Sequence, residues 1–262
     1  MSERVRLPVI DTSAVPDDAT LVDDFTADLV DVAEHHLCPG CGEPIAIRSI
    51  MEAVAELDLT ARSIATFGIG CSTAFSNNLD VEVLQALHGR APSVASGAKR
   101  MLPGANVFTI QGDGDMVNEG LQEVLHAAAR GEAITCFLLN NGVFGETGGH
   151  MTATTVIGQR TKTSIDGRDA DEHGYPLVVG DLLARIQGST YVARGAVNNA
   201  GNVARTKRMV TRALEVQAVG GFSFVEILTM CPTGWFVPTE EAPEYLEAAL
   251  GSVYEVGELK AP

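Results

Sequence analysis

A short acidic loop, Gln111-Gly112-Asp113-Gly114-Asp115, follows an apolar run that ends at Ile110. Its glycines would let the backbone approach a phosphate closely, and a helix that starts after the loop would attract the anion with its N-terminus. The two aspartates would repel a bare phosphate, so a divalent cation is expected between them, and Mg²⁺ prefers carboxylate and diphosphate oxygens. A plain turn between a strand and a helix is the structural alternative for this loop taken alone.

Asn140-Asn141 ends the next apolar run, with room for one helix between it and Asp113. Adjacent parallel strands end at the same edge of a sheet, so Asp113 and Asn141 are expected side by side. A carboxylate, an amide oxygen and a nearby backbone carbonyl can complete one metal shell. Together the two motifs predict a magnesium–diphosphate site.

Sulfur ligands form a third group of candidates. Cys38 and Cys41 are a close pair, and such a pair alone leaves zinc binding and thiol redox chemistry open. An iron–sulfur cluster needs four thiolates. Cys71 and Cys231 each follow a strand-like run, which would bring them to the edge where the Asp113 loop lies. Cys136 falls inside an apolar strand and is best explained as a small buried hydrophobe.

The 262-residue chain carries 34 acidic and 18 basic residues, a net charge of −16, which argues against nucleic-acid and anionic-membrane partners. It has no apolar run near the ~20 residues of a membrane helix and no secretory signal, so a cytoplasmic chain with reduced thiols is expected. Acidic residues concentrate at both ends. We therefore predict an acidic N-terminal arm (1–34), a cofactor-binding domain (35–238) and an acidic C-terminal extension (239–262), with both ends solvated or wrapped around partners.

Helix and strand patterns alternate along the chain and predict an α/β fold, a mostly parallel sheet with helices on both faces. Ligands then lie at the carboxyl ends of the strands. Residues 142–149 are expected as a glycine-rich loop and residues 150–177 as irregular structure. The expected strands are 63–67, 105–110, 134–139, 191–193 and 222–228, and the expected helices are 45–57, 92–102, 116–130, 179–186 and 202–219.

The order of these motifs resembles known patterns. Gly-Asp-Gly, a helix and a strand ending in Asn-Asn are similar to the thiamine diphosphate-binding motif. Between His35 and Trp235 the sequences Cys-Pro-Gly-Cys-Gly, Gly-Cys-Ser, His-Gly-Arg-Ala, Gly-Asp-Gly-Asp, Asn-Asn and Cys-Pro-x-Gly-Trp occur in that order. This set resembles the β subunit of the 2-oxoacid:ferredoxin oxidoreductases, the enzymes of 2-oxoisovalerate, 2-oxoglutarate or pyruvate.

The resemblance implies a diphosphate-type thiamine-binding fold and two inorganic centres. The implied Mg²⁺ ligands are Asp113, Asn141 and the carbonyl of Val143, and the implied [4Fe-4S] ligands are Cys38, Cys41, Cys71 and Cys231. The implied cofactor contacts are Gly70, Cys71, Ser72, His88, Gly114, Asp115, Gly145 and Glu146. The implied reaction is oxidative decarboxylation of a 2-oxo acid to an acyl-CoA, with coenzyme A as co-substrate and electrons passed through the cluster to ferredoxin.

The chain has no recognisable pyrimidine-binding domain, and none of its glutamates can be assigned to activate the aminopyrimidine ring. An α subunit is expected to supply both, and γ and δ subunits are further candidate partners. A non-oxidative thiamine-dependent decarboxylase or synthase subunit, which needs no cluster, is an alternative. A non-catalytic metal-binding scaffold subunit is another.

One departure from the family pattern bears on the substrate. Where the family has tyrosine, glycine and a hydrophobic residue, this chain has Phe-Gly-Glu, which places Glu146 near the cofactor. The loop 142–155 offers only His150 as a cation, and Arg160 and Lys162 lie further along the chain. A second substrate carboxylate would need a cation, so we expect a neutral-tailed 2-oxo acid such as 2-oxoisovalerate or pyruvate.

Overall fold

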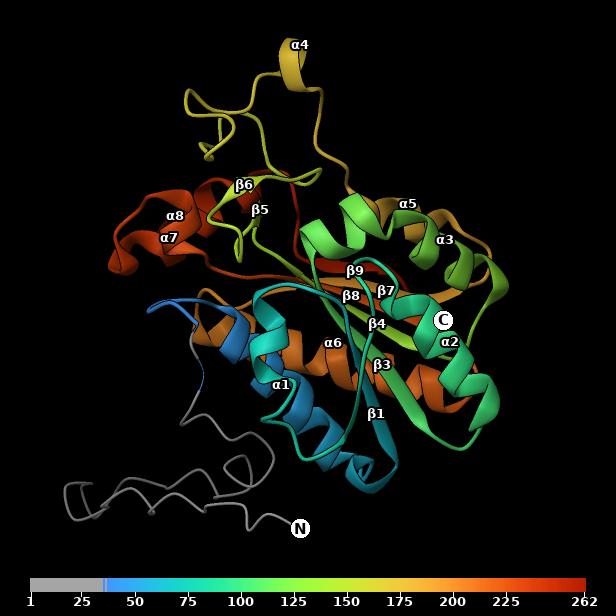
Figure 1. The fold of residues 1–262 in the computed structure, drawn as a ribbon. Helices are drawn as coiled ribbons and strands as arrows, with labels where there is room; N and C mark the ends of the chain where they lie inside the picture. The colour runs from blue at the N-terminus through green and yellow to red at the C-terminus, as the bar shows by residue number, and fades with distance from the viewer. Residues whose placement is uncertain (1–34, 36) are drawn as a thin grey trace, which may run out of the picture.

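Seven strands form one sheet in the order β2-β1-β3-β4-β8-β7-β9 (Figure 1). The computed structural model describes residue 35 and residues 37–262. Neighbouring strands are parallel throughout, except that β9 runs antiparallel to β7. The strands are β1 (Ser63–Phe67), β2 (Glu82–Gln85), β3 (Asn106–Gly112), β4 (Thr135–Asn140), β7 (Ser189–Ala196), β8 (Phe222–Leu228) and β9 (Gly257–Lys260), and a separate hairpin pairs β5 (Val143–Phe144) with β6 (His150–Met151).

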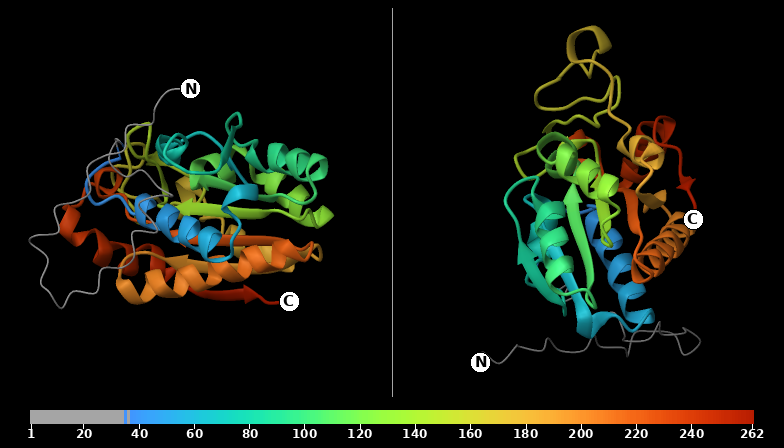
Figure 2. Two further views of the ribbon diagram at one scale, coloured as in Figure 1. Left: turned by 90° about the horizontal axis from the view of Figure 1, so that it is seen from below. Right: turned by 90° about the vertical axis from the view of Figure 1, so that its right-hand side faces the viewer.

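Helices cover both faces of the sheet, so the body has three layers (Figure 2, left). α1 (Glu43–Glu56) and α6 (Ala200–Ala218) pack on one face, and α2 (Ala91–Met101), α3 (Leu121–Arg130) and α5 (Val179–Arg185) pack on the other. Successive strand residues point to opposite faces, so Val107 lies in one buried cluster and Phe108 in the other. No helix in the described part of the chain combines the length and apolar composition that crossing a bilayer requires.

This architecture confirms the predicted mostly parallel α/β sheet, and strands β1 and β8 have the predicted bounds. The predicted helix over 116–130 is wrong in detail, because a π-helix (Gly114–Glu119) precedes α3 and Gly120 separates the two. The backbone of Gly89 presses against this break, and a Cβ on Gly120 would lie 2.3 Å from the Gly89 carbonyl oxygen. The short exposed strand β2 carried no predicted pattern.

The C-terminal residues 239–262 fold onto the sheet, whereas their charge predicts a solvated extension. They form α8 (Ala242–Ala248), a 3₁₀ turn (Leu250–Ser252) and β9. Leu246, Leu250 and Tyr254 are buried in the same cluster as α1 and α6. Apolar side chains at these spacings therefore outweigh the surrounding acidic residues. The predicted N-terminal arm, residues 1–34, lies outside the described residues.

Residues 150–177 are mostly irregular, as expected, and carry the short helix α4 (Ala170–His173) at the tip of a loop that projects from the body (Figure 1; Figure 2, right). Arg168 is buried at the base of this loop. Its guanidinium donates to the backbone carbonyls of Thr155 (2.6 Å), Gly174 (2.9 Å) and Tyr175 (2.9 Å). One cation thereby satisfies carbonyls from both sides of the loop.

Candidate active site

Asp113 and Asn141 meet at the carboxyl edge of the sheet. Asp113 follows β3 and Asn141 follows β4, and these parallel neighbours are paired up to Gly112 opposite Leu139. The Asp113 carboxylate accepts a hydrogen bond from the backbone N–H of Asn141. The structure thus brings these two residues together as the sequence predicts.

The Asp113 carboxylate is almost fully buried, with 1% of the residue exposed. Its Oδ2 accepts hydrogen bonds from the hydroxyls of Thr152 (2.6 Å) and Thr154 (2.5 Å). Burial raises the pKa of Asp113 to about 6, and the hydrogen bonds oppose that rise. Neither threonine was identified from the sequence, although the run Thr152-Ala-Thr-Thr155 directly follows the glycine-rich loop.

The turn after β4 is held by its own polar groups. Oδ1 of Asn141 accepts a hydrogen bond from the Val143 backbone N–H (3.1 Å), and between them Gly142 takes a positive φ of 70°. The Asn141 carbonyl oxygen accepts from the Trp235 indole N–H (2.7 Å). Trp235 belongs to α7 (Pro232–Trp235), directly after Cys231, so the cysteine turn is tied to the candidate metal loop.

The Asp115 carboxylate connects its own loop to the loops after β1 and β2. Its Oδ1 accepts from the backbone N–H of Gly89 (2.7 Å) and of Ile69 (3.1 Å) and lies 3.0 Å from His88 Nδ1. Gln111 donates to the other carboxylate oxygen. The carboxylate is therefore engaged within the protein, where it orients the loops after β1 and β2.

Small residues let these loops approach one another. A Cβ on Gly114 would lie 2.2 Å from the Phe144 ring, and the Phe144 ring centroid lies 6.3 Å from that of His88. Gly70 has open space around its Cα and a φ of 153°, while Ser72 is buried in the 3₁₀ helix Cys71–Phe75. These side chains surround the carboxyl edge beside Asp113.

Cys71 and Cys231 converge on Gly145. A Cβ at Gly145 would lie 3.0 Å from the Cys71 sulfur and 3.7 Å from the Cys231 sulfur, so only glycine leaves this space free. The turn that carries Cys38 and Cys41 docks against the same region, because the N–H of Gly42 donates to the Met230 carbonyl (2.9 Å).

The buried thiols resist ionisation. Desolvation raises the pKa of Cys231 to about 12 and raises the pKa values of Cys41 and Cys71 further. Charges on the other cysteines contribute to each of these shifts, which reflects how closely the four thiols cluster. Cys136 lies apart from them, fully buried in β4 in the cluster beneath α2 and α3.

Glu43 is a site residue that the motif analysis missed, although it directly follows the Cys-Pro-Gly-Cys-Gly sequence. It starts α1, is 2% exposed, and its Oε2 has no hydrogen-bond partner among the described residues. Burial raises its pKa to about 8, and the charges of Asp113 and Glu146 raise it further. Glu43 is therefore close enough to Asp113 and to the buried thiols for their charges to affect one another.

Glu146 is exposed and close enough to Cys71 and Glu43 to raise the pKa of both groups. Lys162 lies further along the chain but is close to this loop in space. Lys162 folds back, its backbone N–H donates to the Gly149 carbonyl (2.8 Å), and a Cβ on Gly148 would lie 2.6 Å from its ammonium nitrogen. A cation therefore stands beside the glycine-rich loop.

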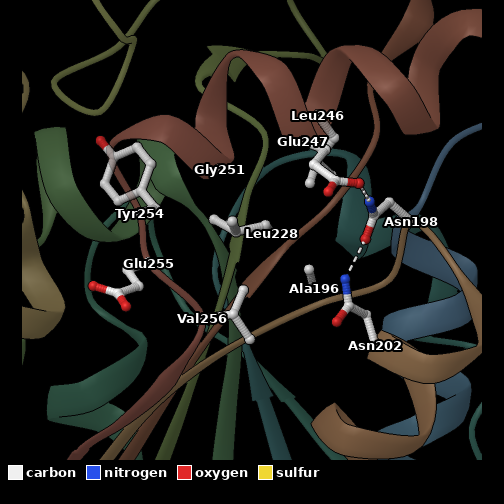
Figure 3. A pocket seen from close by; sticks show the side chains of 10 residues that line it. All are labelled: Ala196, Asn198, Asn202, Leu228, Leu246, Glu247, Gly251, Tyr254, Glu255 and Val256. Carbon is white, nitrogen blue, oxygen red and sulfur yellow. Dashed lines mark hydrogen bonds between the residues drawn. The ribbon is translucent and has the colours of Figure 1, made fainter.

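Figure 3 shows a pocket of about 220 Å³, lined by α8 residues, Tyr254 and the ends of β7 and β8. None of the site residues predicted from the sequence lines it.

Over residue 35 and residues 37–262, no group of three or more His, Cys, Asp or Glu side chains is set to hold a metal ion.

Comparison with known proteins agrees with this geometry. Residues 68–227 match the model of the thiamine pyrophosphate enzyme C-terminal TPP-binding domain. The chain is 38% identical over 222 residues to ketoisovalerate oxidoreductase subunit VorA of Methanothermobacter thermautotrophicus, an alignment that covers 84% of this chain and 46% of the relative. The chain thus spans about half the length of that relative.

Two further comparisons cover more of the matched protein. The chain is 36% identical over 197 residues to 2-oxoglutarate synthase subunit KorB of Archaeoglobus fulgidus, covering 75% of this chain and 69% of the relative. Its structure matches 2-oxoglutarate:ferredoxin oxidoreductase from Magnetococcus marinus with a TM-score of 0.74 and 26% identity, over 90% of this chain and 84% of that chain. That structure contains 2-oxoglutarate, coenzyme A and succinyl-CoA.

The role of Asp115 as a structural tie is testable. Asp115→Asn should lower the free energy of unfolding by about 1–3 kcal/mol, because an amide N–H₂ would oppose the donors that the buried carboxylate now accepts from. Urea denaturation of the two proteins measures the change. Asp166→Asn, the same replacement at an exposed position, is the control. Equal stability of the Asp115 variant and the wild type would contradict the assignment.

Proposed function

Because the chain belongs to the β-subunit family of the 2-oxoacid:ferredoxin oxidoreductases, we propose that it binds thiamine diphosphate for the oxidative decarboxylation of a 2-oxo acid to an acyl-CoA. The observation that carries the proposal is the meeting, at one sheet edge, of the Asp113–Asn141 pair with the thiols around Gly145. A [4Fe-4S] cluster held by Cys38, Cys41, Cys71 and Cys231 would supply the electron transfer to ferredoxin. We assign the reaction to the cytoplasm, where thiols stay reduced, because all five cysteines are free.

The donor set fits Mg²⁺. Asp113 is a buried carboxylate whose partners are hydroxyls and a backbone N–H, so a cation would supply the charge it lacks. The Asn141 amide oxygen accepts one hydrogen bond and keeps a second lone pair, and Val143 offers its carbonyl. Hard oxygen donors of this kind suit Mg²⁺ bound to a diphosphate.

The same edge supplies the proposed contacts to thiamine diphosphate, the cofactor that acts as the electron sink for decarboxylation. Gly70 has open space around it, Gly145 lies beside the Cys71 sulfur, His88 and Phe144 present rings, and Asp115 Oδ1 lies 3.0 Å from His88 Nδ1. The remaining proposed contacts are Cys71, Ser72, Gly114 and Glu146.

The thiols fit an iron–sulfur cluster in their chemistry. Burial and mutual repulsion oppose thiolate formation by Cys41, Cys71 and Cys231, and iron would reverse this because metal coordination deprotonates a thiol. Four cysteine ligands are the set that a [4Fe-4S] cluster requires, and Cys38 completes it. Trp235 packs against the Cys231 turn and is 2% exposed, which keeps water from that side.

The proposed enzyme is a complex. We assign the aminopyrimidine side of the cofactor, with its activating glutamate, to an α subunit, and γ and δ subunits remain further candidates. The relative from Saccharolobus solfataricus is named as a subunit β, which agrees with assembly from different chains. Coenzyme A is the proposed acyl acceptor, and it is present with succinyl-CoA in the Magnetococcus marinus structure.

We propose a neutral-tailed 2-oxo acid, of the 2-oxoisovalerate type, as the substrate. Glu146, whose charge reaches Cys71 and Glu43, disfavours a second substrate carboxylate nearby. The two ketoisovalerate oxidoreductase relatives, at 38% and 39% identity, are more similar than the 2-oxoglutarate relatives at 30–36%. Lys162, whose ammonium lies beside Gly148, would favour a dicarboxylate instead.

For the magnesium site, Asp113→Asn should weaken Mg²⁺-dependent binding of thiamine diphosphate by about tenfold or more, since the anionic ligand of a hard cation is lost. Calorimetric titration of the assembled enzyme with the cofactor, over a range of Mg²⁺ concentrations, measures this. Asp166→Asn should bind as the wild type does. Unchanged affinity in Asp113→Asn would remove Asp113 from the ligand set.

For the cluster, Cys231→Ser should lose or convert it and Cys136→Ser should keep it, because Cys136 lies in the opposite core cluster. Iron content and low-temperature EPR of anaerobically purified protein distinguish the two variants. Iron loss in Cys136→Ser alone would overturn the ligand assignment. A wild-type protein that binds the cofactor but no iron would instead favour a non-oxidative decarboxylase.

For the substrate, kcat/KM of the complete enzyme should be higher for 2-oxoisovalerate or pyruvate than for 2-oxoglutarate, because the Glu146 carboxylate disfavours a distal carboxylate beside it. Steady-state assays on the three acids, with a low-potential dye as acceptor, give the ratios. A preference for 2-oxoglutarate above about tenfold (~1.4 kcal/mol) would refute the neutral-tail proposal. Lys162→Met would then test whether this lysine is the cause.

A further inference from the structure

Tyr254 links the acidic C-terminal segment to residues 152–155, the segment whose threonines bind Asp113. It lies between the 3₁₀ turn Leu250–Ser252 and β9, and its ring is fully buried. Its hydroxyl donates a 2.6 Å hydrogen bond to the backbone carbonyl of Thr154. Figure 3 shows Tyr254 next to Glu255 at one side of the pocket beneath α8.

Thr154 is also one of the two threonines that hold Asp113. Its hydroxyl donates to the Asp113 carboxylate at 2.5 Å, beside the bond from Thr152. The Tyr254 hydroxyl is thus one residue removed from the proposed magnesium ligand. It fixes the backbone of the segment 152–155, and the threonine side chains of this segment donate hydrogen bonds to that ligand.

A buried ion pair between Arg194 and Glu226 lies next to Tyr254. The Arg194 guanidinium lies 5.4 Å from the Tyr254 ring centroid and donates to the Glu255 carbonyl (3.2 Å). Its Nε donates to Glu226 Oε2 at 2.7 Å, and the two residues are directly opposite one another on β7 and β8. Neither is more than 2% exposed.

The Arg194–Glu226 pair is also connected to the turn after β4, which carries Asn141. Glu226 accepts a 2.7 Å hydrogen bond from the Asn140 side-chain amide, and the Asn140 amide oxygen accepts from the Gly142 backbone N–H (3.0 Å). Asn140 directly precedes Asn141. One connected polar network therefore braces the turn that carries Asn141 and, through Thr154, the Asp113 carboxylate. A fully satisfied buried network of this kind fixes one geometry.

We propose that Tyr254 is a positioning residue for the magnesium–diphosphate site, which makes the acidic C-terminal segment part of that site. This inference rests on the proposed function for the identity of the ligand. The matched thiamine pyrophosphate domain ends at residue 227, so the tie comes from sequence beyond the recognised domain. Tyr254 touches neither metal nor cofactor and acts through Thr154 on Asp113.

Tyr254→Phe removes the hydroxyl and keeps the ring that packs on Arg194. In the assembled enzyme the Mg²⁺ concentration for half-maximal binding of thiamine diphosphate should rise about fivefold, the equivalent of one hydrogen bond of about 1 kcal/mol. At saturating Mg²⁺ and cofactor, kcat should remain at the wild-type value. The matched control is Tyr191→Phe, because the Tyr191 hydroxyl donates to Glu258 (2.8 Å) in the same C-terminal segment, away from the loops.

Amide hydrogen exchange of residues 152–155, measured on enzyme stripped of Mg²⁺ and cofactor, tests the tie without relying on the proposed function. Exchange should accelerate in Tyr254→Phe and remain at the wild-type rate in Tyr191→Phe. Unchanged exchange in Tyr254→Phe, or an equal shift of the Mg²⁺ midpoint in both variants, would overturn the proposal. If the wild type binds no cofactor, the proposed function fails while the exchange result still decides the tie.

Discussion

Placing the Asp113 carboxylate in the protein interior is the constraint on which the carboxyl edge of the sheet depends. A buried carboxylate without a counter-charge is costly, and in the part of the chain described by the structure Asp113 forms no ion pair with a basic side chain. Hydroxyls from Thr152 and Thr154 and a backbone N–H only partly offset that cost, since the pKa is still raised to about 6. The loops that carry these donors must therefore be held in place. The Arg168 guanidinium binds the Thr155 carbonyl, and the Arg194 guanidinium binds Glu226, which accepts a hydrogen bond from Asn140.

The thiols present the same physical problem a short distance away. Glu43 contributes to the raised pKa of Cys41, Cys71 and Cys231, so several groups that would carry negative charge share one poorly solvated region. Such a region becomes favourable when cations enter it. A hard divalent ion would suit the oxygen donors and iron would suit the sulfur donors, so the two proposed centres differ in the ligands that one sheet edge offers them.

Local sequence patterns predicted the fold because alternating strands and helices with buried faces leave few arrangements open. They also predicted that Asp113 and Asn141 meet, since both lie directly after strands that pair. The partners of Asp113 were not predictable in this way, because Thr152 and Thr154 reach it from an irregular loop whose course depends on tertiary contacts, among them the bond from Tyr254 to Thr154. The break at Gly120 has the same origin, since it depends on the close approach of Gly89.

The outermost strands of the sheet are both short. β2 and β9 have four residues each, they carry the charged residues Glu82, Glu258 and Lys260, and the pairing of β9 with β7 contains a register shift. Short, charged and irregular edges are poor templates for strand addition by another molecule, so this sheet is protected against edge-to-edge aggregation. The longer strands that end at the site, β3, β4 and β8, have their backbone groups paired on both sides within the chain. The site can therefore sit on fully paired strands while the outer strands resist amyloid-like growth.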